Sequence, residues 1–335
     1  MKIVVDDKIP YIREKLALLA DEVVYLRGAD ITADDVKDAD ALIVRTRTQC
    51  NQQLLEGSKV QLVATATIGF DHIDTDYLQQ AGIAWTNCPG CNADSVAQYL
   101  ECSLLLLEQE KGFTLKDSTI GIVGCGHVGS RVETVAERLG MRVLVCDPLL
   151  GNPDYVSMDV IERESDVITF HVPLTREGRY ATFHLGNDDF FHRLTRVPYI
   201  INTSRGEVVD NDALLAALQE GRVKDAVMDV WEREPDLNLE LLQRVFIGTP
   251  HIAGYSADGK VNADNMVIDA LCRHFHLPHP GQIIPPPLPA GFKDTGSPLD
   301  YYNPLFDSFQ LKKEPSKFEK WRNNYPIRRE KVHTL

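Results

Sequence analysis

The fold is decided by one stretch in the middle of the chain, Ser118-Thr119-Ile120-Gly121-Ile122-Val123-Gly124-Cys125-Gly126-His127-Val128-Gly129-Ser130. An apolar run leads into the pattern Gly-x-Gly-x-x-Gly, and a helix-compatible run at 131–139 ends before Gly140. A second apolar run, 141–146, then ends at Asp147. This order of strand, glycine turn, helix, strand and acid predicts the first half of a dinucleotide-binding βαβ unit.

Each glycine of this motif has its own physical reason. We expect Gly124 to permit the tight turn, Gly126 to let the backbone approach a pyrophosphate, and Gly129 to let the helix pack close to the strand. The N-terminus of the helix would present free N–H groups to the phosphates. An ordinary βα turn is the alternative, but the flanking strand, helix and acid favour the dinucleotide site.

Asp147 indicates which dinucleotide binds. Its carboxylate can accept hydrogen bonds from both ribose hydroxyls and would repel a 2′-phosphate. The residues after it, Pro148-Leu149-Leu150, include no arginine that could neutralise such a phosphate. The sequence therefore predicts NAD as the cofactor, in preference to NADP.

Composition restricts the class of protein. The chain has 335 residues, enough for two domains, and its 44% hydrophobic and 25% charged residues are usual for a globular protein. The formal net charge of −14 argues against a nucleic acid or an anionic membrane as the main partner. The N-terminus turns acidic too soon for a signal peptide, and the apolar runs are too short to span a membrane, so we expect a cytoplasmic protein.

The cysteines do not suggest a disulfide framework, because the seven are odd in number and scattered. The segment Cys88-Pro89-Gly90-Cys91 has the spacing of a redox or metal pair. No second cysteine pair completes a zinc site, and the Pro-Gly centre favours a turn before a helix. We therefore expect no metal site.

Short apolar runs alternate with helical patterns along the rest of the chain, which predicts an α/β fold with two doubly wound parallel-sheet domains. We expect a flavodoxin-like substrate domain and a Rossmann NAD domain, followed by a short C-terminal tail region. The expected boundaries are 1–95 with 257–280 for the substrate domain, 96–256 for the NAD domain, and 281–335 for a proline-rich linker and shortened C-terminal region.

Three polar residues, Arg205, Glu234 and His251, follow strands on the edge expected to face the cofactor. His251 would take the hydroxyl proton while a hydride leaves an alcohol carbon for NAD. Glu234 would hold the imidazole ring, and Arg205 would bind a substrate carboxylate bidentately. Each has a structural explanation when taken singly, but together on a fold that binds NAD they favour catalysis.

Polar residues also follow two strands of the first domain. Arg45, Thr46 and Arg47 come after one strand, and Thr67-Ile68-Gly69 come after the next. Because ligands collect at the carboxyl ends of parallel strands, we expect these residues to contact the substrate. The alternative for the two arginines is that they are solvated loop charges.

Several segments resemble the D-isomer-specific 2-hydroxyacid dehydrogenases. They are NTSRG at 202–206, DVWEREP at 229–235, TPHIAG at 249–254, HVPLT at 171–175 and GFDHID at 69–74. Within that superfamily, CPGCNA at 88–93, HIAGYSADGK at 251–260 and FEKWRNNYPIRRE at 318–330 are similar to the 4-phosphoerythronate dehydrogenase family. The resemblance covers nearly all of residues 1–275 and then the last of these segments.

The resemblance implies NAD-dependent oxidation of 4-phospho-D-erythronate to (R)-3-hydroxy-2-oxo-4-phosphooxybutanoate, in the biosynthesis of pyridoxal 5′-phosphate (vitamin B6). It implies that Arg205 and Glu234 lie in the active site and that His251 is the acid/base. It implies substrate contacts at Thr46, Thr67 and Tyr255. Besides the three glycines, it implies NAD contacts at His127, Val128, Asp147, Val172, Thr203, Ser204, Arg205, Asp229 and Gly254.

The resemblance also implies a homodimer built partly through the C-terminal region, which is shortened here to about 55 residues after Pro280. We expect Arg45 or Arg47 to meet the substrate phosphate, with the pair Arg328-Arg329 as the second candidate. Two other functions are alternatives: another D-2-hydroxyacid dehydrogenase, for example one acting on 3-phosphoglycerate, and a non-enzymatic NAD-sensing regulator on the same scaffold.

Overall fold

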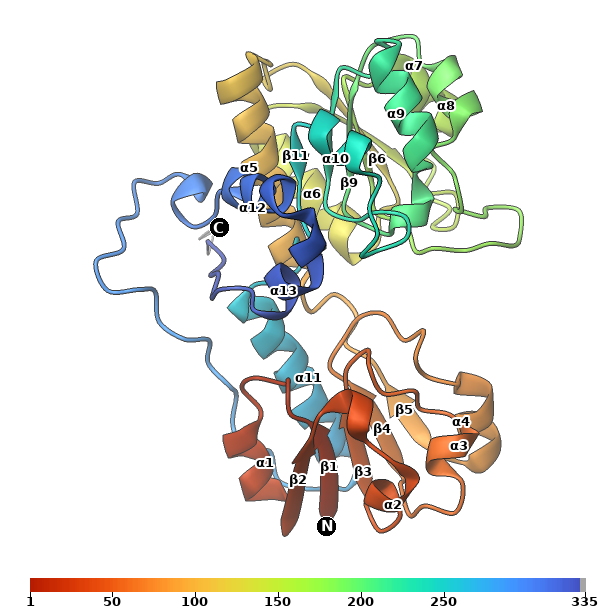
Figure 1. Ribbon diagram of the computed structural model, residues 1–335, viewed down its shortest axis with the longest axis vertical. Coiled ribbons are helices and arrows are strands. Elements are labelled where there is room, and N and C mark those ends of the chain that lie inside the picture. The colour runs from red at the N-terminus through yellow and green to blue at the C-terminus, as the bar shows by residue number, and fades with distance from the viewer. Residues whose placement is uncertain (332–335) are drawn as a thin grey trace. The chain divides into compact units, whose positions relative to one another are not determined.

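The computed structural model describes residues 1–331, and the chain divides into two compact units. Unit 1 comprises Met1–Asn92 and Ser256–Pro289, and unit 2 comprises Ala93–Tyr255 together with the chain from Ala290 onward. Each unit contains one parallel β-sheet with interleaved helices (Figure 1). The α/β class with two doubly wound parallel sheets, predicted from the sequence, is confirmed.

The sheet of unit 1 has the strand order β2-β1-β3-β4-β5, and all of its pairings are parallel. Its strands are β1 (Lys2–Asp6), β2 (Glu22–Leu26), β3 (Ala41–Val44), β4 (Leu62–Thr65) and β5 (Ala84–Thr86). This is the flavodoxin-like order, in which the direction of winding reverses between the first and third strands. Ligands in such sheets bind beyond the carboxyl ends of the strands at this reversal, here at β1 and β3.

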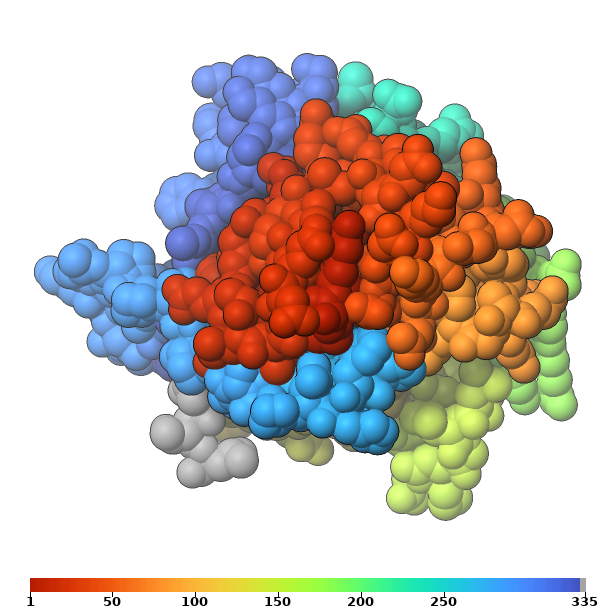
Figure 2. All heavy atoms as spheres, turned by 90° about the horizontal axis from the view of Figure 1, so that it is seen from below, coloured from red at the N-terminus to blue at the C-terminus, as the bar shows by residue number. Residues whose placement is uncertain are grey.

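Helices cover both faces of this sheet, so its central strands β1, β3 and β4 are buried on both sides. The helices are α1 (Arg13–Leu19), α2 (Ala33–Val36), α3 (Gln52–Leu55), α4 (Thr75–Ala81) and α11 (Ala257–His274), with a 3₁₀ turn at Gly28–Asp30. Alternate residues of β1 join different clusters: Ile3 packs with Val267 of α11, and Val4 packs with Leu54 and Leu78. Figure 2 shows a face of unit 1 on which the light-blue residues of α11 lie beside the red and orange N-terminal segments.

The sequence patterns did not identify β2 or the helices α2, α3 and α4. Strand β2 lies at the edge of the sheet, and none of its residues is fully buried, so its hydrophobic pattern is weak. The three helices have at most seven residues each. Side chains stabilise their first turns: Asn51 accepts from the N–H of Leu54, and Asp74 accepts from the N–H of Tyr77.

The sheet of unit 2 has the order β11-β10-β9-β8-β6-β7 and is also parallel throughout. Its strands are β6 (Thr119–Val123), β7 (Arg142–Cys146), β8 (Val167–Phe170), β9 (Tyr199–Asn202), β10 (Asp225–Met228) and β11 (Ile247–Gly248). Its helices up to residue 244 are α5 (Ala93–Lys111), α6 (His127–Arg138), α7 (Met158–Glu164), α8 (Asp188–Arg193), α9 (Asn211–Gln219) and α10 (Leu239–Arg244). The winding reverses between β6 and β8, where the glycine motif lies.

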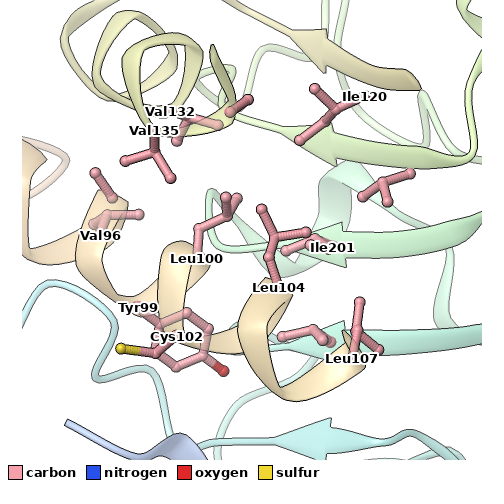
Figure 3. Close-up of a cluster of buried hydrophobic side chains, with 14 of the residues drawn as sticks. Val96, Tyr99, Leu100, Cys102, Leu104, Leu107, Ile120, Val132, Val135 and Ile201 are labelled. Carbon is pink, nitrogen blue, oxygen red and sulfur yellow. The ribbon is translucent and has the colours of Figure 1, made fainter. Parts of the chain in front are cut away.

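Helix α5 supplies the largest share of one core of unit 2. Its residues Val96, Leu100, Leu104 and Leu107, which the sequence places on one apolar side, are all buried. They lie toward Ile120 and Ile201 of the sheet and Val132 and Val135 of α6 (Figure 3). Burying such side chains contributes about 1.5–3 kcal/mol each, so this helix is held by packing rather than by its ends.

The C-terminal segment packs onto unit 2. After the proline-rich stretch it forms α12 (Pro304–Lys313) and α13 (Phe318–Asn323), with 3₁₀ turns at Pro298–Asp300 and Pro315–Lys317. Leu311 and Phe318 join the buried cluster that contains Trp231 and Leu241. Among residues 1–331, no helix combines the length and the apolar character that crossing a membrane requires.

A buried carboxyl group lies on α11 in unit 1. Asp264 is 1% exposed, and its Oδ2 accepts a hydrogen bond from the N–H of Tyr11 at 3.0 Å. Burial raises the pKa of Asp264 to about 7, although the Tyr11 N–H and the charges of Arg45 and Lys260 act in the opposite direction. This group therefore titrates near neutrality, whereas it titrates near pH 4 in the unfolded chain.

We expect Asp264→Asn to change how stability depends on pH. The pKa of Asp264 is higher in the folded state than in the unfolded chain. Its stabilising contribution to the free energy of unfolding is therefore fully present below about pH 4 and is lost as the pH rises to about 7. The free energy of unfolding of the wild type, relative to Asp264→Asn, should therefore fall by about 2–4 kcal/mol between pH 4 and pH 8. Urea titrations across this range measure the difference. The exposed carboxylate of Asp76 serves as the control through Asp76→Asn, and a difference that stays constant with pH would contradict the prediction.

Candidate active site

The glycine turn after β6 is fixed by two close backbone approaches. Gly124 has a φ of +90°, and a Cβ there would lie 2.8 Å from the carbonyl oxygen of His171 and 2.7 Å from Cγ1 of Val172. A Cβ at Gly129 would lie 2.1 Å from the carbonyl oxygen of Gly124. Both positions therefore exclude any side chain, for the reasons that the sequence suggested: a tight turn, and close packing of helix on strand.

Gly126 is different, because open space surrounds it. It is the N-cap residue of α6, it makes no side-chain capping bond, and a Cβ there would meet nothing within 4 Å. No contact within the protein explains why this position at the N-terminus of a helix is a glycine. A ligand that approaches the backbone closely would explain it. An anionic group such as a pyrophosphate suits this position, since the helix dipole and the N–H groups of its first turn favour negative charge.

Asp147 lies beside this turn. It follows β7, and its Oδ2 accepts a hydrogen bond from the N–H of Cys125 at 2.8 Å. Its Oδ1 accepts from the N–H of Leu149 at 3.2 Å. The carboxylate is thus held next to the glycine motif, and its role in selecting a ribose without a 2′-phosphate stays a prediction.

His251 and Glu234 form a hydrogen-bonded pair. The Nδ1 atom of His251 lies 2.8 Å from Oε2 of Glu234, and the other carboxylate oxygen accepts from the N–H of Trp231 at 2.9 Å. Burial alone would raise the pKa of Glu234. The hydrogen bond and charge of His251, the Trp231 N–H and the charge of Arg322 outweigh burial and lower that pKa below its ordinary value. Glu234 is therefore a carboxylate at neutral pH, in contact with one ring nitrogen of the histidine.

Asp229 holds the loop that carries His251. It follows β10 and is 1% exposed. Its Oδ1 accepts from the Thr249 hydroxyl at 2.6 Å and the Ile252 N–H at 2.8 Å, and its Oδ2 accepts from the Ala253 N–H at 2.9 Å. Its main-chain oxygen accepts from the N–H of His251 at 2.8 Å. The role as an NAD contact that the resemblance implies for Asp229 stays a prediction, as does that of Gly254 at the end of this loop.

Arg205 reaches the same region from β9. A Cβ at Gly206 would lie 1.9 Å from the carbonyl oxygen of Trp231, so the chain after Arg205 passes directly against the segment that leads to Glu234. Asn202 shapes the turn in between: its Nδ2 donates to the carbonyl oxygen of Arg205 at 2.9 Å, and its Oδ1 accepts from the Ser204 N–H at 3.1 Å. The ends of β9, β10 and β11 thus place the three predicted catalytic residues in unit 2.

The cofactor residues predicted after β8 and β9 lie next to each other. Val172 follows β8 and touches the position of Gly124, as described above. The hydroxyl of Thr203 lies 3.5 Å from Nδ1 of His171. Burial lowers the pKa of His171 to about 3, so this imidazole is neutral at physiological pH. The structure brings these residues to the β6/β8 reversal, and their contacts with NAD stay predictions.

The predicted substrate residues of the N-terminal part lie at the carboxyl edge of the unit 1 sheet. Thr46 and Arg47 are exposed after β3, and Nη1 of Arg45 donates to the carbonyl oxygen of Lys8 at 3.4 Å. The Thr67 hydroxyl donates to the carbonyl oxygen of Gly69 at 2.8 Å. The side chain of Asn87 donates to the carbonyl oxygen of Ile68 at 2.7 Å. Strands β3 and β4 are neighbours, so the structure brings these residues to one edge, and their contacts with substrate stay predictions.

Sequence reasoning missed the part that the C-terminal segment takes in unit 2. Nε of Arg322, on α13, donates to the hydroxyl of Tyr255 at 3.1 Å. Arg328 is 4% exposed, and its guanidinium donates to the carbonyl oxygens of Ile252, Ala253 and Ser95. Arg328, considered above for the substrate phosphate, is thus engaged by backbone next to His251. The only signal in the sequence was the similarity of residues 318–330 to one family.

The Cys-x-x-Cys pair does not have the features of a redox site. Cys88 is buried, and its thiol donates to the carbonyl oxygens of Thr65 at 3.3 Å and Ala263 at 3.4 Å. Burial raises the pKa of Cys88 well above its ordinary value, so the reactive thiolate is strongly disfavoured. The segment acts as the turn before α5.

Comparisons with known proteins agree with this geometry. Residues 105–253 match the family described as D-isomer specific 2-hydroxyacid dehydrogenase, NAD binding domain. The erythronate-4-phosphate dehydrogenase of Bacteroides thetaiotaomicron is 54% identical over 98% of this chain and 97% of its own length. The structure is similar to an NAD⁺-bound 3-phosphoglycerate dehydrogenase from Entamoeba histolytica, with a TM-score of 0.70 and 30% identity over 86% of this chain and 99% of the other. It is also similar to a D-lactate dehydrogenase from Aquifex aeolicus complexed with NAD and lactic acid, with a TM-score of 0.68 and 28% identity over 82% and 96%.

Two glycine substitutions separate ligand binding from folding. We expect Gly126→Ala to keep the wild-type melting temperature, because its Cβ meets no protein atom, but to weaken NAD binding by about tenfold or more, equivalent to roughly 1.4 kcal/mol. Gly129→Ala, the matched control, should lower the melting temperature, because its Cβ would overlap the Gly124 carbonyl. Thermal melts and calorimetric titration with NAD measure both effects. Normal NAD affinity in Gly126→Ala would place the pyrophosphate elsewhere.

Proposed function

Because the chain belongs to the erythronate-4-phosphate dehydrogenase family of the D-isomer-specific 2-hydroxyacid dehydrogenases, we propose that it oxidises 4-phospho-D-erythronate to (R)-3-hydroxy-2-oxo-4-phosphooxybutanoate with NAD. This reaction belongs to the biosynthesis of pyridoxal 5′-phosphate. The observation that carries the proposal is the His251–Glu234 hydrogen bond, in the same unit as the glycine turn and Asp147. Similarity over 98% of the chain to a relative of that name supports the choice of substrate.

The proton of the substrate hydroxyl goes to His251. Since Nδ1 of the ring faces Glu234, the other nitrogen, Nε2, is the atom that receives the proton. Glu234 is negatively charged at neutral pH, so it stabilises the imidazolium that forms and fixes the plane of the ring. NAD, when bound, accepts the hydride from the substrate carbon.

Arg205 binds the substrate carboxylate in this proposal. Its guanidinium is planar and permanently charged, so it pairs with a carboxylate through two parallel hydrogen bonds and polarises the adjacent oxygen. The close approach at Gly206 keeps Arg205 near Glu234 through the backbone. Thr46, Thr67 and Tyr255 are further substrate contacts, with Arg45 or Arg47 at the phosphate.

NAD binds along the β6/β8 reversal. Gly124, Gly126 and Gly129 form the turn, and His127 and Val128 begin the helix whose N–H groups face the pyrophosphate. Asp147 binds the ribose hydroxyls. The remaining cofactor contacts are Val172, Thr203, Ser204, Arg205, Asp229 and Gly254.

The proposal includes a homodimer and a cytoplasmic location. Within residues 1–331, which include all seven cysteines, no disulfide forms, and this suits a reducing compartment. The C-terminal segment, through which the family resemblance implies dimerisation, leaves Phe306 and Phe309 of α12 72% and 68% exposed. Large exposed aromatic side chains on one helix suit an interface with another copy of the chain.

A second candidate is a dehydrogenase for 3-phosphoglycerate, favoured by the likeness to the Entamoeba histolytica enzyme. The two functions are separated by measuring NADH formation from 4-phosphoerythronate, 3-phosphoglycerate and D-lactate. We expect the highest kcat/KM with 4-phosphoerythronate. Preference for another substrate would remove the substrate assignment and leave the reaction class in place, whereas binding of NAD without turnover of any hydroxy acid would favour a regulator.

We expect His251→Gln to lower kcat by about 10²–10⁴, which is the usual contribution of a positioned acid/base group. Glutamine keeps a polar side chain near Glu234 but cannot take the proton. Steady-state NADH formation at pH 7–9 measures the loss. The binding of NAD should not change, because the glycine turn is untouched, and near-normal turnover would exclude His251 as the acid/base.

A further inference from the structure

A guanidinium from the C-terminal segment lies beside the catalytic pair. Nε of Arg322 donates to the hydroxyl of Tyr255 at 3.1 Å, and its charge is among the causes that lower the pKa of Glu234. Tyr255 follows His251 by four residues, on the loop that Asp229 holds. Arg322 is thus anchored to the catalytic loop through one nitrogen and lies close enough to Glu234 to influence it electrostatically.

The other nitrogens of Arg322 are only weakly engaged by protein. Its Nη1 forms an ion pair with Oε1 of Glu319 at 4.0 Å, which is beyond hydrogen-bond distance, and among residues 1–331 no group accepts a hydrogen bond from Nη2. The side chain of Arg322 is 24% exposed, so it lies at the surface of unit 2 and can meet a ligand. A guanidinium that is fixed at Nε, and whose terminal nitrogens make only this long ion pair with protein, has the geometry of a bidentate anion site.

The position of Arg322 is set by its neighbours on both sides along the chain. Phe318, one turn earlier on α13, is 1% exposed in the core of unit 2. Tyr325, three residues later, lies against Tyr255 with ring centroids 6.0 Å apart, and its hydroxyl donates to Asp307 at 2.8 Å. Arg328 then donates to the carbonyl oxygens of Ile252 and Ala253. The segment is therefore fixed to the catalytic loop at several points.

We propose that Arg322 is a substrate-binding residue that holds an anionic group of the substrate, either its carboxylate or its phosphate. The inference rests on the proposed function, because that substrate carries an anion at each end. The formal net charge of the chain is −14, so a dianionic or trianionic substrate needs local positive charge. Among the three predicted catalytic residues, all in unit 2, Arg205 is the one arginine. Arg322 supplies a second cation beside Tyr255, from the same chain.

The test compares three variants of the full-length protein. Arg322→Gln removes the charge, Arg322→Lys keeps the charge but loses the planar fork, and Lys320→Gln removes the same charge from an exposed residue of the same helix. Each is assayed for kcat and KM with 4-phosphoerythronate and with erythronate, which lacks the phosphate. If erythronate turns over slowly, its inhibition constant replaces its KM. Melting temperature and the KM for NAD report on folding and on the cofactor site.

We expect Arg322→Gln to raise the KM for 4-phosphoerythronate by at least about tenfold, with the KM for NAD unchanged, because hydrogen bonds to a charged group are lost. Arg322→Lys should raise it less, and Lys320→Gln should leave it unchanged. If the KM for 4-phosphoerythronate and the KM or inhibition constant for erythronate rise together, Arg322 binds the carboxylate. If only the constant for the phosphorylated substrate rises, Arg322 binds the phosphate.

An unchanged KM for 4-phosphoerythronate in Arg322→Gln would overturn the inference, as would an equal rise in Lys320→Gln. If Arg322→Gln does not fold, Arg322→Lys decides, since a KM equal to that of the wild type would then overturn it. Failure of the proposed function is a different result: the wild type itself would show no preference for 4-phosphoerythronate.

Discussion

The buried carboxylate of Asp229 is the interaction on which the arrangement of unit 2 depends most. It accepts from one hydroxyl and two backbone N–H groups of the segment 249–253, so a single charge closes the loop after β11 against the end of β10. Thr249 extends this network to α5, because its hydroxyl lies 2.7 Å from that of Tyr99. A buried charge is tolerated only when it is fully hydrogen-bonded, and here those bonds also hold His251 in a left-handed backbone conformation with a φ of +58°.

The same network positions the His251–Glu234 pair. Nε1 of Trp231 donates to the carbonyl oxygen of Thr249 at 2.9 Å, and the N–H of Trp231 donates to Glu234. The chain after β10 therefore runs from Asp229 directly into the residues that hold Glu234, while the loop bound by Asp229 carries the histidine. Glu234 and His251 are thus positioned by one buried cluster rather than by two independent loops.

Much of the fold could be predicted from the sequence, because buried strands appear as continuous apolar runs and buried helices as apolar residues at helical spacing. The apolar runs of β1, β3, β8 and β9 are buried on both faces, and α5 is buried over most of its length with apolar residues such as Leu100 and Leu104 at helical spacing, so each was recognisable. Strand β2 escaped because it is a partly exposed edge strand. Helices α2, α3 and α4 escaped because short helices depend on caps and tertiary contacts more than on a repeating pattern.

The candidate site was predictable only in part, for a related reason. Glycine motifs, strand-end acids and the sequence HIAG at 251–254 are local signals, and from them Gly124, Asp147, Glu234 and His251 were predicted as site residues. The roles of Asp229, Arg322 and Arg328 depend on pairing between distant segments. The residues around Arg328 in the sequence do not indicate that it binds the carbonyl oxygens of Ile252 and Ala253. The charge pattern also does not distinguish Arg328 from the adjacent Arg329.

The hydrogen bonds of Arg328 to the loop that carries His251 can form only after Arg328 has been translated. The ribosome makes His251 about 77 residues before it makes Arg328, a delay of several seconds at ordinary translation rates. During that interval the glycine turn and both sheets can already be complete, but the carbonyl oxygens beside His251 lack their buried cation. The glycine turn is therefore translated before the buried cation that completes the hydrogen bonding of the loop carrying His251.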